Sequence, residues 1–353
     1  MSYLTVLPGY TFTSNEAVTY AKLNSLGQPV VSLTTEFFNQ LSSFKNGFIN
    51  GNMTVWQRAV VRGSTTRTCT SGAKTWLADR WFVRPAGANC TQDKSTTVPS
   101  GAVAAYSVKI TGAASVTAVD FGQRIESSDS YSNWRRTRTF SAYVYNDTGS
   151  SFTPLLIVNT PSAADNYATN TARLSTSLQA CPSGGWTQVS YSFDASGYTN
   201  IGNGCEVVIQ VPSGSLSSTG KAVYITQLQC EPGSVVTAQE PRLVTFELQM
   251  CQRYALGLVG QVVGFAADAT NLPNKGIMTY PTTMRAKPVF DGNNSATADA
   301  TNDYFTATAG LAGTPAVSGY AAETIFACAN AAANWTPTAQ INITCVLTAE
   351  DLT

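Results

Sequence analysis

Between residues 47 and 242 the sequence consists of short runs in which apolar and polar residues alternate, separated by Gly, Ser, Asn and Pro. Successive side chains of a β-strand point to opposite faces, so this pattern predicts strands with one buried and one exposed face. The spacing of the runs is typical of a sandwich or barrel and not of α/β units. We expect strands at 104–110, 138–145, 155–159, 187–193, 206–211 and 222–229.

Two short helices are predicted before residue 46. The sequence Thr-Ser-Asn-Glu at 13–16 has the spacing of a capping box and begins the first helix, which ends near residue 26. The second, at 35–44, is too short to be stable alone. It places four apolar side chains on one stripe, those of Phe37, Phe38, Leu41 and Phe44. We therefore expect this stripe to pack on the following domain or on sister copies around a symmetry axis.

A third helical pattern follows Pro241, and strand patterns return from residue 260, ending in the clean alternation of 340–347. The chain has 353 residues, which favours two compact units over one. We expect an all-β fold, with a sandwich or barrel followed by a second, C-terminal β-domain and with short N-terminal helices. The predicted units are a helical segment at 1–45, the sandwich at 46–242, a short helical connector at 243–259 and the C-terminal β-domain at 260–353.

Charge is scarce and balanced in this sequence. Charged residues make up 12% of the chain, and 21 Lys and Arg residues are matched by 21 Asp and Glu residues. Because no net field would attract a polyanion, we expect no nucleic-acid partner. The chain lacks an apolar run of the length that spans a membrane and lacks a secretory-signal pattern at its N-terminus, so we expect no membrane insertion and synthesis in the cytoplasm.

The sequence contains no histidine. Mechanisms that need an imidazole near neutral pH are therefore excluded, including the Ser-His-Asp and Cys-His arrangements and the common zinc hydrolase sites. A glycosidase needs only two carboxyl groups at a suitable separation, and Asp120 with Glu126 is the pair to consider. No segment gathers acidic and aromatic residues convincingly, so we expect a non-catalytic protein with no catalytic residues and no cofactor.

Eight cysteines are spread along the chain without a C-x-x-C pair, which argues against zinc, and we expect no metal. An even number of cysteines in a β-rich chain raises the possibility of disulfides. A protein made in a bacterial cytosol and exposed after lysis would reconcile disulfides with the missing signal sequence, whereas buried free thiols are the alternative. The first candidate pair is Cys328 with Cys345.

Several stretches carry a family resemblance in their order and spacing. They are NGNMTVWQR at 50–58, ADRW at 78–81, QRIE at 123–126, GWTQV at 185–189, ITQLQCEPGS at 225–234, CQRY at 251–254 and YPTTMRAKP at 280–288. Together they resemble a β-jelly-roll module of phage tail-fibre and virion proteins, and GWTQV is similar to a strand of carbohydrate-binding sandwich modules. Residues 8–24 are similar to the start of phage virion proteins that seat on a base.

The resemblance implies a virion appendage protein, namely a tail, collar or baseplate fibre, usually homotrimeric, with a jelly-roll carbohydrate-binding-like sandwich at 46–242. The implied partners are further copies of the chain, neighbouring virion proteins reached through residues 1–45, and bacterial surface polysaccharide. The implied location is the virion, after synthesis in the host bacterial cytoplasm. A dedicated receptor-binding, lectin-like protein and a capsule or glycan depolymerase are the alternatives. The eight cysteines depart from the usual pattern of the family.

A sugar site needs an exposed aromatic ring for the apolar face of a pyranose and polar side chains for its hydroxyl groups. The best local match lies in a polar stretch between two predicted strands and consists of Tyr131, Asn133, Trp134 and Arg135. A core position for Trp134 remains an equal alternative. Trp56, Trp81 and Trp186 lie within apolar patterns, so we expect them in the core.

Overall fold

The computed structural model describes residues 45–263 without a gap. It also describes residues 274–279, 281–286 and 340–350, and six short strand segments at 4–7, 30–33, 289–290, 304–307, 316–317 and 325–330. The helices predicted at 13–26 and 35–44 lie outside the described residues. In this part of the chain, no helix is long and apolar enough to cross a membrane.

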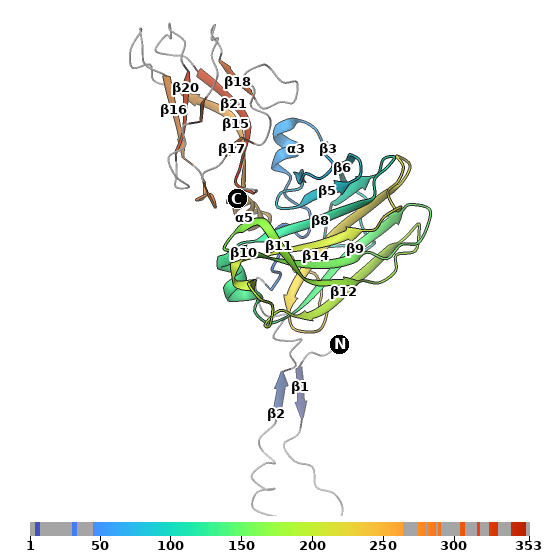
Figure 1. Cartoon of the computed structure of the whole chain (residues 1–353). Coiled ribbons are helices and arrows are strands. Elements are labelled where there is room, and N and C mark those ends of the chain that lie inside the picture. Colours follow the sequence, from blue (N-terminus) through green and yellow to red (C-terminus); the bar gives the residue numbers. More distant parts are fainter. Residues whose placement is uncertain are drawn as a thin grey trace, which may run out of the picture.

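Two six-stranded antiparallel sheets form a β-sandwich (Figure 1). Sheet A has the strand order β12-β9-β14-β7-β6-β3, and sheet B has the order β11-β10-β13-β8-β5-β4. The strands of sheet A are β12 (Trp186–Asp194), β9 (Thr137–Asp147), β14 (Ala222–Pro232), β7 (Ser107–Thr111), β6 (Cys90–Ser95) and β3 (Thr66–Cys69). Those of sheet B are β11 (Asn166–Ser177), β10 (Leu155–Ala163), β13 (Cys205–Val211), β8 (Ala118–Ile125), β5 (Phe82–Ala86) and β4 (Thr75–Trp76).

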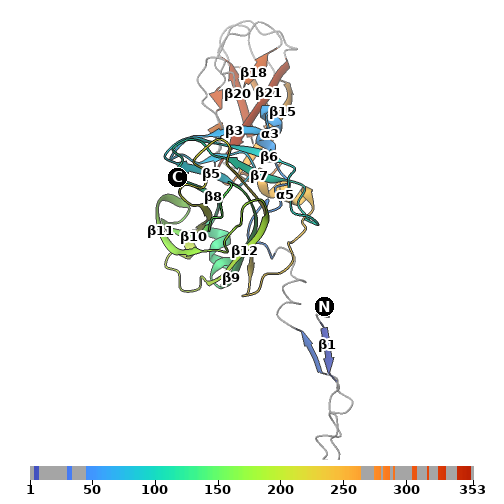
Figure 2. The same cartoon turned by 90° about the vertical axis from the view of Figure 1, so that its right-hand side faces the viewer.

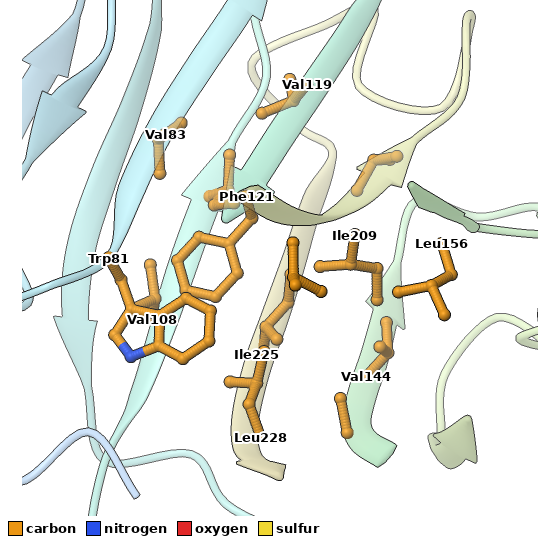
Figure 3. Packing of buried hydrophobic residues seen from close by; sticks show 14 of the residues in the cluster. Trp81, Val83, Val108, Val119, Phe121, Val144, Leu156, Ile209, Ile225 and Leu228 are labelled. Carbon is orange, nitrogen blue, oxygen red and sulfur yellow. The ribbon is translucent and has the colours of Figure 1, made fainter. Parts of the chain in front are cut away.

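The core lies between the two sheets. Figure 3 shows Val108, Val144 and Ile225 of sheet A facing Phe121 and Ile209 of sheet B. Most of these residues are β-branched, which suits a pleated, buried surface. The alternation read from the sequence therefore buries one face of each sheet, and the chain is an all-β sandwich as predicted.

Trp81 fixes one end of this core. Its indole stacks on Phe121 with ring centroids 5.1 Å apart, and Phe48 meets it edge-on at the same distance. Its N–H donates a 3.0 Å hydrogen bond to the carbonyl of Asn50, so the polar atom of this buried ring is satisfied. The core positions predicted for Trp56 and Trp81 are confirmed, because both are at most 3% exposed.

The six predicted strands correspond to β7, β9, β10, β12, β13 and β14, with shifts of a few residues at their ends. The expected half-exposed pattern fails at β13, where the predicted outer residues Glu206 and Val208 are buried along with the inner ones. On the outer face of β13, the buried Glu206 forms ion pairs with Lys74 and Arg124, at 3.4 and 2.9 Å. A charged side chain thus occupies a position that alternation alone would place in solvent.

Helix α5 (Val244–Gln252) follows the sandwich, where the third helical pattern predicts it. Beyond it, β15 (Ala255–Val263) pairs with β21 (Gln340–Thr348), and Ala255 lies directly opposite Thr348. The strands from β15 onwards and the hairpin of β1 (Leu4–Leu7) and β2 (Val30–Leu33) lie on opposite sides of the sandwich in both views (Figures 1 and 2).

The remaining described strands complete two small sheets. One joins β17 (Val289–Phe290) and β18 (Tyr304–Ala307) to β21, and the other has the order β16 (Asn274–Thr279), β20 (Ile325–Asn330), β19 (Ala316–Val317). Cys328 lies on β20 and Cys345 on β21, so the two residues of the predicted disulfide belong to different sheets. The pairing of these two cysteines stays a prediction.

A buried ionic cluster joins the end of β21 to the sandwich. The carboxylate of Glu350 accepts hydrogen bonds from the backbone N–H of Arg80 at 3.1 Å and from its guanidinium at 2.7 Å, and it lies 3.6 Å from Arg58. Arg58, on helix α3 (Gln57–Arg62), also pairs with Asp79 at 3.2 Å. All four side chains are at most 2% exposed. Two cations and two carboxylates therefore neutralise one another without solvent.

Candidate functional site

Trp134 does not present the exposed ring that the sequence suggests. Its side chain is 1% exposed, and the buried Arg138 guanidinium lies over its ring at 4.5 Å from the centroid. Phe48 packs beside it, with ring centroids 5.9 Å apart. Trp134 closes η1 (Ser130–Trp134), a single π-helical turn that carries its side chain inward. The prediction of Trp134 as a sugar platform is therefore wrong, and its core alternative holds.

The other members of the predicted set remain at the surface. Tyr131 is 64% exposed, and the Arg135 guanidinium lies over its ring at 5.4 Å from the centroid. The ring lies against Gly202 of η2 (Ile201–Asn203), where an added Cβ would approach it to 2.9 Å. Asn133 is also exposed, but its backbone carbonyl accepts a hydrogen bond from buried Arg138. Tyr131 with Arg135 thus forms a small platform with a single ring.

A larger aromatic surface lies on the outer face of sheet A. Trp186, Tyr145 and Tyr224 lie directly opposite one another on the adjacent strands β12, β9 and β14. The ring centroids are 5.5 Å apart in each neighbouring pair. All three residues are partly exposed, and Lys109 of β7 continues the row with its ammonium group 5.6 Å from the Tyr224 ring. We call these three aromatic residues and Lys109 the aromatic row.

Small hydroxylated and polar side chains surround the aromatic row. On either side of it along the strands, the same face carries Tyr143, Gln188, Thr111 and Thr91 in partly or fully exposed positions. The charged residues on this face are Lys109, the carboxylates of Asp93, Asp147 and Asp194, and the buried carboxylate of Glu231. Rings that offer an apolar surface and hydroxyl or amide groups that hydrogen-bond are the two kinds of contact that a sugar requires. The face is therefore chemically suited to a neutral polyhydroxylated ligand.

Sequence reasoning missed this row for a specific reason. The apolar strand pattern around Trp186 predicts a core position, but this residue is only half-buried and its side chain lies on the outer face of the sheet, opposite Tyr145. Tyr145 and Tyr224 were read only as members of strands. The three residues meet because β9 pairs with both β12 and β14, and this pairing sets their register. A period-two reading that places Val144 and Ile225 inside would already place Tyr145 and Tyr224 outside.

Asp120 and Glu126 do not form a glycosidase pair. They are six residues apart along β8 and its end, or about 20 Å in an extended chain, whereas paired glycosidase carboxyl groups lie within about 10 Å. Asp120 accepts hydrogen bonds from Arg84 at 3.1 Å and from Gln210 at 2.7 Å. Glu126 receives two hydrogen bonds from the Arg253 side chain, at 3.1 and 2.8 Å. The sequence-based pairing is wrong, and both groups act in ion pairs.

The electrostatics of Glu126 agree with this structural role. Burial by itself would raise the pKa of the Glu126 carboxyl, but hydrogen bonds from Arg253 and Tyr254 outweigh burial and lower it. A general acid needs the opposite shift, towards neutral pH. Among the residues that the structure describes, no group of three or more Cys, Asp or Glu side chains is arranged to hold a metal ion.

No family model matches the sequence, and no curated protein matches it. Several solved structures are similar to part of this chain. The enzymatically active domain of tailspike protein 4 from bacteriophage CBA120 is 14% identical, with 54% of this chain and 22% of that chain covered and a TM-score of 0.32. This chain therefore spans about a fifth of that chain.

Two carbohydrate-binding modules are also similar in fold. The CBM22-1 xylan-binding domain of Xyn10C from Paenibacillus barcinonensis is 13% identical, with 48% of this chain and 95% of that chain covered and a TM-score of 0.31. A CBM4 structure is 13% identical, with 44% and 88% covered and a TM-score of 0.28. These likenesses concern the fold alone.

Proposed function

We propose that this chain is a non-catalytic component of a tailed-phage virion, a tail, collar or baseplate fibre, whose sandwich contacts bacterial surface glycan through the outer face of sheet A. The observation that carries the glycan contact is the aromatic row, in which Trp186, Tyr145 and Tyr224 lie side by side on three strands. The virion assignment rests on the ordered sequence resemblance that runs along nearly the whole chain.

The dimensions of the aromatic row favour an oligosaccharide over a monosaccharide. Strand pairing sets the three rings in a row across the sheet, with centroids 5.5 Å apart in each neighbouring pair and with tilted or edge-on ring planes. A ligand that covered them all would need more than one pyranose ring, and Lys109 would meet its hydroxyl groups at one end. Because one cation is accompanied by the carboxylates of Asp93 and Asp147, a neutral glycan fits this face better than a polyanionic one.

The proposed mechanism combines a weak site with repetition. Binding in the millimolar range corresponds to only about 4 kcal/mol, and a half-exposed row of rings is expected to give an affinity of this order. A homotrimer presented in several copies on one particle would turn single contacts into intramolecular ones and raise the overall affinity without new contacts. Residues 1–45 are the segment that we propose attaches to neighbouring virion proteins.

Substitution in the aromatic row tests the proposal directly. Affinity electrophoresis of the full chain in gels that contain host surface polysaccharide should show retardation, and Trp186→Ala and Tyr224→Ala should each weaken it about tenfold or more, as truncation of a central aromatic contact does. Tyr191→Ala is the matched control. Tyr191 is an exposed aromatic residue on the same strand, β12, but it alternates with the residues that share a face with Trp186 and therefore belongs to the other face of the sheet. Equal binding by all three variants would refute the site.

A second variant separates the two candidate surfaces. Tyr131→Ala removes the one ring of the predicted set that is exposed, because Trp134 is buried, and it leaves sheet A untouched. If this variant alone abolishes retardation, the glycan contact lies at Tyr131 and Arg135, and the dedicated receptor-binding alternative gains support. Release of reducing sugar by the wild-type chain would contradict the non-catalytic assignment and support a depolymerase.

A further inference from the structure

Two cysteines face each other across the edge of sheet A. Cys69 ends strand β3 and Cys90 begins strand β6, and the two are directly opposite each other in the antiparallel register. Both side chains are buried, at 0% and 2% exposure, and both are free thiols. They belong to the core cluster, so they point to the same side of the sheet. The Cys69 thiol donates a weak hydrogen bond to the backbone carbonyl of Arg67 at 3.9 Å.

This pairing meets the geometric requirement for a disulfide. Opposed residues of an antiparallel pair have Cα atoms about 4.5 to 5.5 Å apart, inside the range of about 4.4 to 6.8 Å that disulfides span. The other cysteines of the described sandwich lie opposite different residues: Cys181 faces Phe152, Cys205 faces Ile125 and Cys230 faces Phe140. The Cys69–Cys90 pair is therefore singled out by register.

We propose that Cys69 and Cys90 form a redox modification site that closes to a disulfide when the protein meets a disulfide oxidant such as oxidised glutathione. One cysteine sulfur attacks a sulfur of the oxidant and releases one reduced glutathione, leaving a mixed disulfide. The second cysteine sulfur then attacks that mixed disulfide and releases the other. The two cysteine thiols are oxidised, one glutathione disulfide is reduced, and the two thiol hydrogens end on the two glutathione molecules.

The environment of the pair makes this oxidation slow in the folded protein. The adjacent Cys90 thiol and burial raise the pKa of the Cys69 thiol, so Cys69 stays protonated and is a poor nucleophile for the first attack. The oxidant must also reach buried sulfurs. Strand β3 is at the edge of sheet A, where β6 is its single partner among the described strands, so local opening at this edge is the route of access. The site is thus protected during synthesis in a reducing cytoplasm and reacts on long exposure.

The closed bridge would fix the segment from Cys69 to Cys90. That segment carries β4, β5 and the buried pair Asp79 and Arg80, which hold Arg58 and Glu350 in the ionic cluster. A cross-link that closes a loop of this kind restricts the unfolded chain and so stabilises the folded one. Oxidation is therefore expected to stabilise the edge of sheet A together with the attachment of β21.

The test compares full-length wild-type protein with Cys90→Ala and with Cys181→Ala, a matched buried cysteine outside the pair. Each is incubated with oxidised glutathione, and disulfides are mapped by mass spectrometry of non-reduced peptides. We expect a Cys69–Cys90 peptide and an upward shift of the thermal midpoint in the wild type and in Cys181→Ala, both reversed by dithiothreitol. The midpoint of Cys90→Ala should not shift.

Two results would overturn the proposal. One is a wild-type protein that keeps both thiols reduced after incubation at temperatures just below its unfolding midpoint, where the edge opens most often. The other is a stable mixed disulfide of glutathione with Cys69 or Cys90 that does not go on to form the Cys69–Cys90 disulfide. A disulfide mapped to Cys328 and Cys345 would leave this result unaffected, because peptide mapping scores each pair separately.

Discussion

Removing the charge of Glu350 should destabilise the protein far more than removing the charge from an exposed ion pair. In the folded chain the Glu350 carboxylate lies 2.7 Å from the Arg80 guanidinium and 3.6 Å from that of Arg58, and none of the three side chains is more than 2% exposed. The Glu350→Gln variant keeps the shape but removes the negative charge that faces both guanidinium groups. Loss of one partner from a buried ionic group typically costs about 3 to 5 kcal/mol.

The matched control is Arg253→Gln. Arg253 also makes two hydrogen bonds to a carboxylate, that of Glu126, but its side chain is 41% exposed. Exposed ion pairs are worth about 0 to 1 kcal/mol, because solvent screens them. Both variants remove one partner of an Arg–Glu pair, and the partner removed is buried in one case and 41% exposed in the other.

Urea unfolding followed by tryptophan fluorescence measures both variants, since Trp81 directly follows Arg80 in the chain. We expect Glu350→Gln to lower the free energy of unfolding by about 3 kcal/mol with an unchanged dependence on urea, and Arg253→Gln to lower it by less than about 1 kcal/mol. A Glu350→Gln variant as stable as Arg253→Gln would refute the reasoning, because the two guanidinium groups would then not depend on that carboxylate.

Three further predictions concern pH, packing and assembly. Burial, the largest effect, raises the pKa of Asp79 from 3.8 to about 6, so the folded state binds this proton more tightly than the unfolded state does. The wild type should therefore gain stability relative to Asp79→Asn as the pH falls from about 6 to about 4. Urea unfolding at several pH values measures this difference, and a difference that does not change with pH would contradict the prediction. At Gly112 an added Cβ would lie 2.1 Å from the carbonyl oxygen of Leu216, whereas Gly185 faces open space. Gly112→Ala should lower the free energy of unfolding by about 1 to 3 kcal/mol, as measured by thermal unfolding. A decrease no greater than that of Gly185→Ala would show that the backbone moves to accommodate the added Cβ. Light scattering of the purified protein should give a mass near three times 37.4 kDa. A mass of one chain would contradict the homotrimer proposal for the isolated protein.

The fold class and most of the sandwich strands could be predicted because a strand is encoded locally. Alternation over five to nine residues is enough to place β10 or β12, whatever lies beside them. Burial on both faces of β13 could not be predicted in this way. It depends on Lys74, which approaches Glu206 from a loop more than a hundred residues away in sequence.

The candidate site depended more strongly on long-range structure. Trp134 lies in a polar stretch, and its burial under Arg138 and beside Phe48 follows from packing between distant segments. The aromatic row likewise exists because β9 lies between β12 and β14, which brings Trp186 and Tyr224 to either side of Tyr145. Residue types indicated the chemistry of sugar binding, but only strand pairing determined which rings share a face.

The pairing of Ala255 with Thr348 has a consequence for exchange of sequence between related chains. These two residues are cross-strand partners at the base of β15 and β21, so the chain leaves the sandwich and returns to it about 5 Å away. A segment whose two ends are this close can be replaced by another of different length without changing the distance between its two attachment points. A segment exchanged between these residues would need to begin and end in a paired β-ribbon, to leave Glu350 in place, and to replace the contacts that Gly257 makes with Gln57 and Arg285 makes with Glu126.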